Sequence, residues 1–457
     1  MLRAGRARLP EAFRSGPIMP EGTQASYTVS LIKGERMPPK IAVVHSNLAA
    51  IGFVIAFRAG SVYETPKTNG LFHLCEHLLL EGGEKKSRLI LGVEEIGGIV
   101  NGLTVKDCVA LYAKIPKLNF QRAIGVLADG LKALLPRNIN ENQLGAVKRV
   151  IQHEIKLRSA DPLRKVIDTW WKTAYAQDSL SLPPVGSISS LSRITKADVE
   201  RAFQSHFTQA NAMVVWVGDV RPKGVIKKFS ETLTDYPEGN AVFPTYSGNF
   251  ESSPKVSVID AKSDQVHMVF GFVGFRIDDP EADTLRLLGA LVGGRRGSKL
   301  FQRLRIQSGL SYCVNTFIEG YCNGGTFIIH TTCEPGQVLL VTQIVAKTLR
   351  EVKEGRVTDE EVNRARTYLK GKIALERDDA LTQAITLARC GLYQDNADLD
   401  HLLSEARWDS ITKDDIVRTA GRILKPSRLS IVLAGQVPEK MAEDSLALAR
   451  EDLTGGG

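Results

Sequence analysis

Residues 194–220 read ITKADVERAFQSHFTQANAMVVWVGDV, and residues 411–437 read ITKDDIVRTAGRILKPSRLSIVLAGQV. The two segments align without a gap. Each begins with Thr before an acidic first turn, which predicts a helix start, and each ends with a β-rich run that closes on glycine. A helix–strand unit that recurs near the end of each half indicates internal duplication. The second copy repeats these residues of the first: Ile194, Thr195, Lys196, Asp198, Arg201, Val215, Gly218 and Val220.

The beginnings of the two halves correspond as well. Residues 51–60 and 266–275 both predict strands. A polar loop follows each of them, and then an apolar helix at residues 71–80 in one half and 284–292 in the other. Helices and strands that alternate and then repeat predict two tandem homologous domains of the α+β (or α/β) class.

The domain boundaries follow from changes in composition. Residues 235–254 are rich in Pro, Gly, Ser and Asn and lack periodicity, which predicts a linker. We therefore expect a first domain at residues 27–234 and a second at residues 255–440. A disordered leader at residues 1–26 and a tail at residues 441–457 complete the expected organisation.

The composition excludes several classes of protein. Of 457 residues, 43% are hydrophobic and 24% are charged, as in an ordinary globular protein. The net charge of +8 comes without a long Lys/Arg run, so no nucleic-acid partner is expected. The six cysteines form no C-x-x-C pair, which favours reduced thiols. The most apolar stretch, residues 48–57, is too short to cross a bilayer.

The first eighteen residues carry four arginines and one acid, a bias typical of mitochondrial transit peptides. Pro10 and Pro17 would interrupt the amphipathic helix that such a peptide needs, and Met19 is an alternative start. We therefore favour a cytoplasmic protein with a disordered leader. The mitochondrial matrix is the alternative.

Residues 70–80 read GLFHLCEHLLL and predict a zinc site. On a helix, His73 and His77 lie one turn apart on one face and can bind one Zn²⁺. Glu76 lies beside His77, where it can take a proton from a water molecule that the metal activates. An exposed helix face without a metal is the alternative. The many leucines around the three polar residues make the helix largely buried, however, and unligated polar groups are costly there.

A catalytic zinc site needs a third protein ligand. Glu154 is the candidate, because it interrupts a helical stripe of apolar residues that includes Val147, Val150 and Ile151. His153 points about a quarter-turn away. We therefore expect Glu154 to be the ligand and His153 to be structural.

From about residue 27 to residue 437 the chain resembles the pitrilysin-type zinc metallopeptidases, the inverzincins with the H-x-x-E-H motif. It is most similar to the short forms related to mitochondrial processing peptidase and its bacterial homologues. The segments RAGSVYE (58–64) and GGIVNGLT (97–104) carry the resemblance further. It implies mainly antiparallel sheets covered by helices, which form a clamshell, and one Zn²⁺ per chain. It also implies that Glu76 is the general base, and that Asn101 and its strand bind substrate by β-addition.

The second half carries a further family segment, GGRRGSKLFQRLRIQSGLSY, at residues 293–312. The resemblance implies that Arg305 and Tyr312 bind substrate and stabilise the oxyanion across a closed chamber. A surface arginine and a core tyrosine are the alternative. Leu157 stands where catalytic processing subunits have a further acid. The helix at 284–292 lacks H-x-x-E-H, so one metal site per chain is expected.

These features together predict a zinc-dependent endopeptidase that hydrolyses peptides or unfolded polypeptides. The chain is expected to work as a homodimer or with a homologous second subunit. The alternative is a non-catalytic structural or assembly subunit of the same family. Such subunits usually lose part of the zinc set, which this chain retains.

Overall fold

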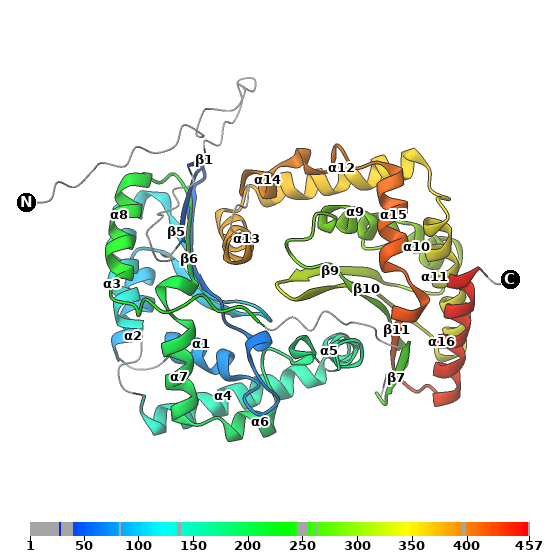
Figure 1. The fold of residues 1–457 in the computed structure, drawn as a ribbon, viewed down its shortest axis with the longest axis horizontal. Coiled ribbons are helices and arrows are strands. Elements are labelled where there is room, and N and C mark those ends of the chain that lie inside the picture. The colour runs from blue at the N-terminus through cyan, green and yellow to red at the C-terminus, as the bar shows by residue number, and fades with distance from the viewer. Residues whose placement is uncertain are drawn as a thin grey trace, which may run out of the picture.

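The computed structural model describes residues 27–28, 40–81, 84–134, 139–176, 178–244, 254–261, 263–394 and 399–455. Two β-sheets, each covered by helices, make up these residues (Figure 1). The first sheet has the strand order β1-β2-β6-β3-β5-β4 and the second the order β7-β11-β8-β10-β9. The strands of the first sheet are β1 (Tyr27–Thr28), β2 (Lys40–His45), β3 (Ala50–Phe57), β4 (Ile99–Thr104), β5 (Val109–Pro116) and β6 (Ala212–Gly218). Those of the second are β7 (Lys255–Ile259), β8 (Val266–Gly274), β9 (Val314–Tyr321), β10 (Gly324–Cys333) and β11 (Ser430–Ala434).

The two sheets share one topology. In the first sheet only β2 and β6 run parallel, and in the second only β7 and β11 do. All other neighbouring strands are antiparallel. Strand β4 ends the first sheet and β9 ends the second, so each half presents an edge strand at the same place in its order. The prediction of two homologous α+β units with mainly antiparallel sheets is confirmed.

The repeated segment forms the same elements in both halves. Residues 194–220 contain α7 and β6, and residues 411–437 contain α15 and β11. Thr195 begins α7 and accepts a hydrogen bond from the Asp198 N–H, and Thr412 begins α15 in the same way with Asp415. In both cases the acid side chain returns to the threonine N–H, which completes a capping box.

Helices cover the outer faces of both sheets (Figure 1). The first half contains α1 (Leu71–Glu81), α2 (Glu84–Glu94), α3 (Phe120–Leu134), α4 (Glu141–Ala160), α5 (Pro162–Ala174), α6 (Ile188–Arg193), α7 (Lys196–His206) and α8 (Pro222–Leu233). The second half contains α9 (Ala282–Val292), α10 (Lys299–Phe301), α11 (Val338–Lys353), α12 (Asp359–Glu376), α13 (Ala380–Tyr393), α14 (Leu399–Leu403), α15 (Lys413–Ile423) and α16 (Glu439–Thr454). None of these helices is long and apolar enough to cross a membrane.

The two halves exchange one helix each. Helix α5 of the first half packs on strands β7, β8 and β11 of the second sheet, and α13 of the second half packs on β3, β5 and β6 of the first. In Figure 1, α13 lies on the face of the first sheet opposite α3 and α8. Each sheet is therefore covered on both faces only when both halves are present. The expected domains 27–234 and 255–440 follow the order of the elements along the chain, and α5 and α13 each pack on the sheet of the other half.

The C-terminal residues form a helix that packs on the second half. Residues 441–454 of the expected tail lie in α16, whose Ala442, Ala449 and Leu453 are buried in the second core. The expected leader lies outside the described residues. Of the expected linker, residues 235–244 contain neither helix nor strand, and residues 245–253 lie outside the described ranges.

Candidate metal centre

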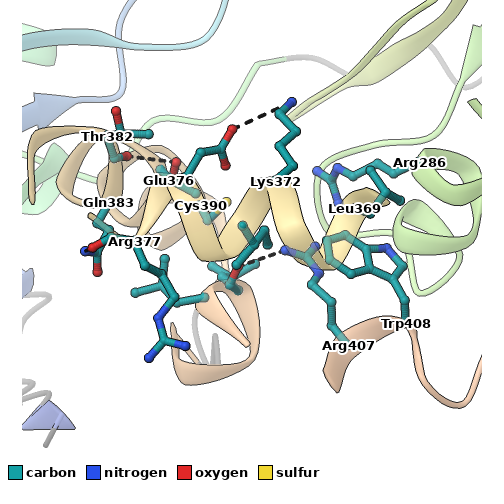
Figure 2. Close-up of a pocket in the computed structure, with 14 residues that line it drawn as sticks. Arg286, Leu369, Lys372, Glu376, Arg377, Thr382, Gln383, Cys390, Arg407 and Trp408 are labelled. Carbon is teal, nitrogen blue, oxygen red and sulfur yellow. Dashed lines mark hydrogen bonds and ion pairs between the residues drawn. The ribbon is translucent and has the colours of Figure 1, made fainter. Parts of the chain in front are cut away.

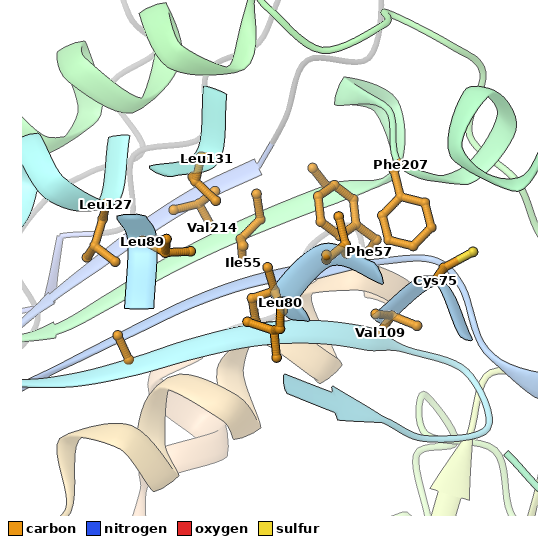
Figure 3. Close-up of a cluster of buried hydrophobic side chains, with 14 of the residues drawn as sticks. Ile55, Phe57, Cys75, Leu80, Leu89, Val109, Leu127, Leu131, Phe207 and Val214 are labelled. Carbon is orange, nitrogen blue, oxygen red and sulfur yellow. The ribbon is translucent and has the colours of Figure 1, made fainter. Parts of the chain in front are cut away.

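Helix α1 carries the predicted histidines and is held by the core of the first half. Its Leu74, Cys75, Leu78 and Leu79 are almost completely buried. Figure 3 shows this core, in which Cys75 and Leu80 of α1 lie near residues of the sheet such as Val109. The apolar back of the helix fixes its rotation, so that the face with the histidines is turned away from the core.

The start of α1 is fixed by Glu64. One carboxylate oxygen accepts hydrogen bonds from the N–H of Gly70 and from the amide of Asn69, both at 2.8 Å, and the other accepts from the N–H of Phe72 at 2.8 Å. These N–H groups at a helix start have no partner within the helix. Burial raises the pKa of Glu64 to about 7, although the three donors oppose that rise. Glu64 therefore determines where the metal-site helix begins.

Glu154 of α4 spans the two histidines. Its two oxygens lie 2.9 Å from the Nε2 of His73 and 3.4 Å from the Nε2 of His77. The two rings stand nearly perpendicular, with centroids 4.7 Å apart. One carboxylate that faces two imidazole nitrogens is one of the donor sets found in catalytic zinc sites. The predicted third ligand thus lies with the two histidines, although Val150 of the proposed apolar stripe is exposed.

Glu76 approaches the site from another side. One oxygen lies 3.3 Å from the Nδ1 of His73, and the same oxygen accepts a hydrogen bond of 3.4 Å from the Thr104 hydroxyl. The ligand atoms of His73, Glu76 and His77 all lie within 4.8 Å of one another. Because Glu76 faces the Nδ1 and Glu154 faces both Nε2 atoms, Glu154 is the better placed to share a metal with the two histidines. Glu76 is then left beside the site.

Strand β4 leaves room for Glu76 at Gly102. A Cβ atom at residue 102 would lie 1.8 Å from an oxygen of Glu76. Any side chain at this position would therefore displace the carboxylate. The contact also brings the backbone of the edge strand directly against the candidate base.

The electrostatics of the cluster suit a cation. Burial alone would lower the pKa of His73, but the carboxylates of Glu154 and Glu76 together raise it to about 9. The hydrogen bond from His73 keeps the pKa of Glu154 below its usual range. Two carboxylates beside two imidazoles therefore attract positive charge, which a proton supplies in the metal-free state. These residues fit a divalent metal by donor type and by spacing.

Asn101 lies on the same edge strand, but its side chain does not face the metal centre. Side chains alternate along a strand, and Gly102 and Thr104 face Glu76. The exposed Asn101 instead accepts a hydrogen bond of 2.8 Å from the N–H of Gly102. Any contact of Asn101 with substrate would therefore be made from the strand edge or from the opposite face of the sheet.

Arg305 and Tyr312, the predicted substrate-binding pair of the second half, are in contact with each other. The guanidinium of Arg305 donates to the carbonyl oxygen of Tyr312 at 3.0 Å and stands 4.2 Å from the centre of the tyrosine ring. Tyr312 is 74% exposed, so it is not a core residue. Among the described residues, no hydrogen bond or ion pair joins this pair to the metal centre of the same chain.

The sequence did not predict the roles of Glu64 and Gly102 in the site. Glu64 belongs to the RAGSVYE segment, but its action on α1 depends on a loop whose path the sequence does not reveal. Gly102 matters because of a contact with Glu76 across two elements. The only sequence signal for the capping role of Glu64 was an acidic residue a few positions before Asn69-Gly70, where the helix was expected to start.

Two segments of the chain match models of known protein families. Residues 40–186 match the model described as insulinase (peptidase family M16), and residues 193–369 match the model described as the peptidase M16 inactive domain. The first match contains the metal centre, and the second contains Arg305 and Tyr312.

Individual relatives agree with these matches. A protein of Streptomyces coelicolor named as an uncharacterized zinc protease is 28% identical over 92% of this chain and 95% of its own length. A Bacillus subtilis protein with the same description is 26% identical over 71% of this chain and 78% of its own length. The fold is similar to that of a protease from Helicobacter pylori, with a TM-score of 0.80 and 18% identity over 90% of this chain and 100% of the other.

Proposed function

The chain belongs to peptidase family M16 as a short-form member, and from this premise we propose that it is a zinc-dependent endopeptidase. The observation that carries the proposal is the convergence of His73, His77 and Glu154 beside the buried Glu76. His73 and His77 would hold the metal through Nε2, and Glu154 would complete the set. When bound, zinc supplies Lewis-acid chemistry that polarises a carbonyl and makes water more acidic.

Glu76 would act as the general base. It is only 7% exposed, and its carboxylate is oriented by Thr104 and by the lack of a side chain at residue 102. A carboxylate held in this way can take a proton from the attacking water and return it to the leaving amine. This assignment separates the roles of the two acids, with Glu154 binding the metal and Glu76 moving the proton.

Strand β4 would bind the substrate as an added strand. It is the last strand of its sheet, so one row of its backbone groups is free to pair with an extended peptide. The Gly102 N–H donates to the side chain of the neighbouring Asn101. A peptide paired there would pass Glu76 with its backbone. Recognition of backbone groups suits substrates of varied sequence, such as peptides or unfolded polypeptides.

Arg305 and Tyr312 would bind the substrate and stabilise the oxyanion. The exposure of Tyr312, and the lack of a bond from the pair to the metal centre of the same chain among the described residues, suit a role across an interface. We propose that two chains face each other and enclose a chamber, either as a homodimer or with a homologous second subunit. A non-catalytic assembly role is the alternative, and the complete metal set of the first half argues against it.

The substitution Glu76→Gln tests the proposal. The variant should retain about one zinc per chain but lose peptide hydrolysis by a factor of roughly 10² to 10⁴. Zinc is measured on the purified protein by elemental analysis, and cleavage is profiled with a peptide library. The matched control is His73→Ala, which should lose both metal and activity. Hydrolysis by Glu76→Gln at the wild-type rate would exclude this residue as the base.

A further inference from the structure

A second candidate site lies away from the metal centre, in a cavity of about 180 Å³ between α12 and α13 (Figure 2). The short helices α14 and η7 (Glu405–Trp408) complete its walls, together with Arg286 of α9. Because α13 packs on the first sheet while α9 and α12 belong to the second half, the cavity lies at a junction of the two halves.

One part of the cavity wall is apolar. Leu369 and Ile373 of α12 contribute to it, and Leu402 and Leu403 of α14 lie against it. The cavity volume of about 180 Å³ is far more than one water molecule needs. Aliphatic walls of this extent favour a short hydrocarbon chain over water.

The other part of the wall is cationic. Asp283 is the one acid with which both Arg286 and Arg407 form ion pairs among the described residues, with Arg286 at 2.7 Å and the Nε of Arg407 at 2.9 Å. Two guanidinium groups thus share one carboxylate. The other two cations of the wall are balanced individually, since Lys372 pairs with Glu376 at 3.7 Å and Arg377 with Glu405 at 3.4 Å. Among the ion pairs of the described wall residues, Arg286 and Arg407 are therefore the two cations that share a single acid.

The thiol of Cys390, which also lines the cavity, does not supply a further negative charge. Burial raises the pKa of Cys390 above its usual range, so the thiol stays neutral. The charges of Arg286, Arg389 and Arg407 oppose that rise in pKa, and the charge of Asp107 adds to it. Arg407 is only 7% exposed, and its guanidinium donates to Asp283 and to the carbonyl of Leu402. Arg286 shares the same acid through one hydrogen bond, and a partly desolvated cation gains more from an anionic partner than an exposed one does.

We propose that this cavity binds a small monoanion with an aliphatic body, namely a short- or medium-chain carboxylate. The carboxylate would lie beside Arg286 and Arg407, and the chain would lie against the leucines of α12 and α14. Since the walls come from elements that pack on different sheets, occupancy would stabilise the junction of the two halves. The peptidase assignment is not needed for this inference.

Titration calorimetry of the full chain with octanoate tests the proposal, with octylamine as a probe of equal length and opposite charge. Octanoate should bind in a saturable manner at one site and raise the melting temperature, and octylamine should do neither. Arg286→Met removes one of the two cations that share Asp283 and leaves the Arg407–Asp283 pair in place. It should weaken octanoate binding at least about tenfold, as expected for a charge-assisted contact. Arg286→Lys keeps the charge and should bind octanoate within about threefold of wild type.

Lys440→Met is the matched control, because Lys440 of α16 is exposed, pairs with Asp444 at 2.8 Å and does not line the cavity. It should change octanoate binding by less than about twofold. Melting curves of each variant establish that it is folded before binding is compared. The proposal would be overturned by a failure of octanoate to bind, by equal binding of octylamine, or by unchanged binding in a folded Arg286→Met protein.

Discussion

Single residues in the metal centre act mainly through charge. Glu154 and Glu76 flank His73, and together they hold a proton on this histidine in the metal-free protein. A metal must replace that proton before it can bind Nε2. The same two acids that attract the cation therefore also make its binding depend on pH.

The raised pKa of His73 predicts opposite pH effects on the metal-free and metal-loaded protein. The folded pKa of about 9 lies above the ordinary value of 6.5, so protonation of His73 stabilises the metal-free fold at low pH. This stabilisation, up to about 3 kcal/mol, is fully present below about pH 6.5 and is lost as the pH rises towards 9. Over the same range zinc affinity should rise, because fewer protons compete for His73.

Melting temperatures of chelator-treated and zinc-loaded protein between pH 6.5 and 9 provide the measurement. The gap between the two curves should widen as the pH rises. Curves that remain parallel over this range would mean that no proton is displaced from His73 when the metal binds.

At the scale of elements, both halves pack a helix against the edge strand of their sheet. In the first half the helix supplies the large side chain and the strand supplies a glycine, and in the second half this is reversed. In the first half α1 places Glu76 against Gly102 of β4. In the second half α9 places Gly289 against β9, and a Cβ atom at residue 289 would lie 2.6 Å from the side chain of Ile318. The strand side chain of the second half thus fills the space that the helix carboxylate fills in the first. A carboxylate at residue 289 of α9 would have no room there.

The cap on α1 predicts a linked loss of stability and zinc affinity. In Glu64→Gln, one oxygen that accepts an N–H bond becomes an amide donor, so a buried N–H at the helix start loses its partner. The cost should be about 1–3 kcal/mol of unfolding free energy, and zinc should bind more weakly because α1 begins less precisely. Chemical denaturation and zinc titration measure the two effects. Glu95→Gln, at an exposed position after α2, is the control and should change neither.

The exchanged helices depend on glycines at their contact points. A Cβ atom at residue 271 of β8 would lie 2.0 Å from the buried Trp170 of α5. Gly271→Ala should therefore cost about 1–3 kcal/mol or more, because neither the strand nor the tryptophan can move freely. Chemical denaturation measures the loss. Gly371→Ala, in an exposed part of α12 with no atom near the new methyl group, should instead gain about 0.5–1 kcal/mol.

At the scale of the whole molecule, local signals predicted much more than long-range ones did. The repeat was predictable because Thr195 and Thr412 begin their helices through contacts within one turn. The grouping of His73 with Glu154 was predictable because each is a polar residue among the apolar residues of its own helix. The exchange of α5 and α13 was not, since an apolar stripe does not specify which of two similar sheets it will cover. The direction of the Asn101 side chain likewise depended on the register of β4.

The last prediction concerns assembly, and it follows from the separation of the two functional groups. The chain contains both the metal set and the Arg305–Tyr312 pair, but no hydrogen bond or ion pair joins them among the described residues. If two chains face each other, each metal centre is completed by the pair of the partner. A mixture of Glu76→Gln and Arg305→Ala proteins, each inactive alone, should then regain activity, because one of the two sites in a mixed dimer has all its groups. Peptide hydrolysis after subunit exchange is the measurement, with a mixture of Glu76→Gln and His73→Ala as the control, since both sites of that dimer remain defective. Equal inactivity of both mixtures, with exchange demonstrated by differently tagged chains, would mean that each chain completes its own site.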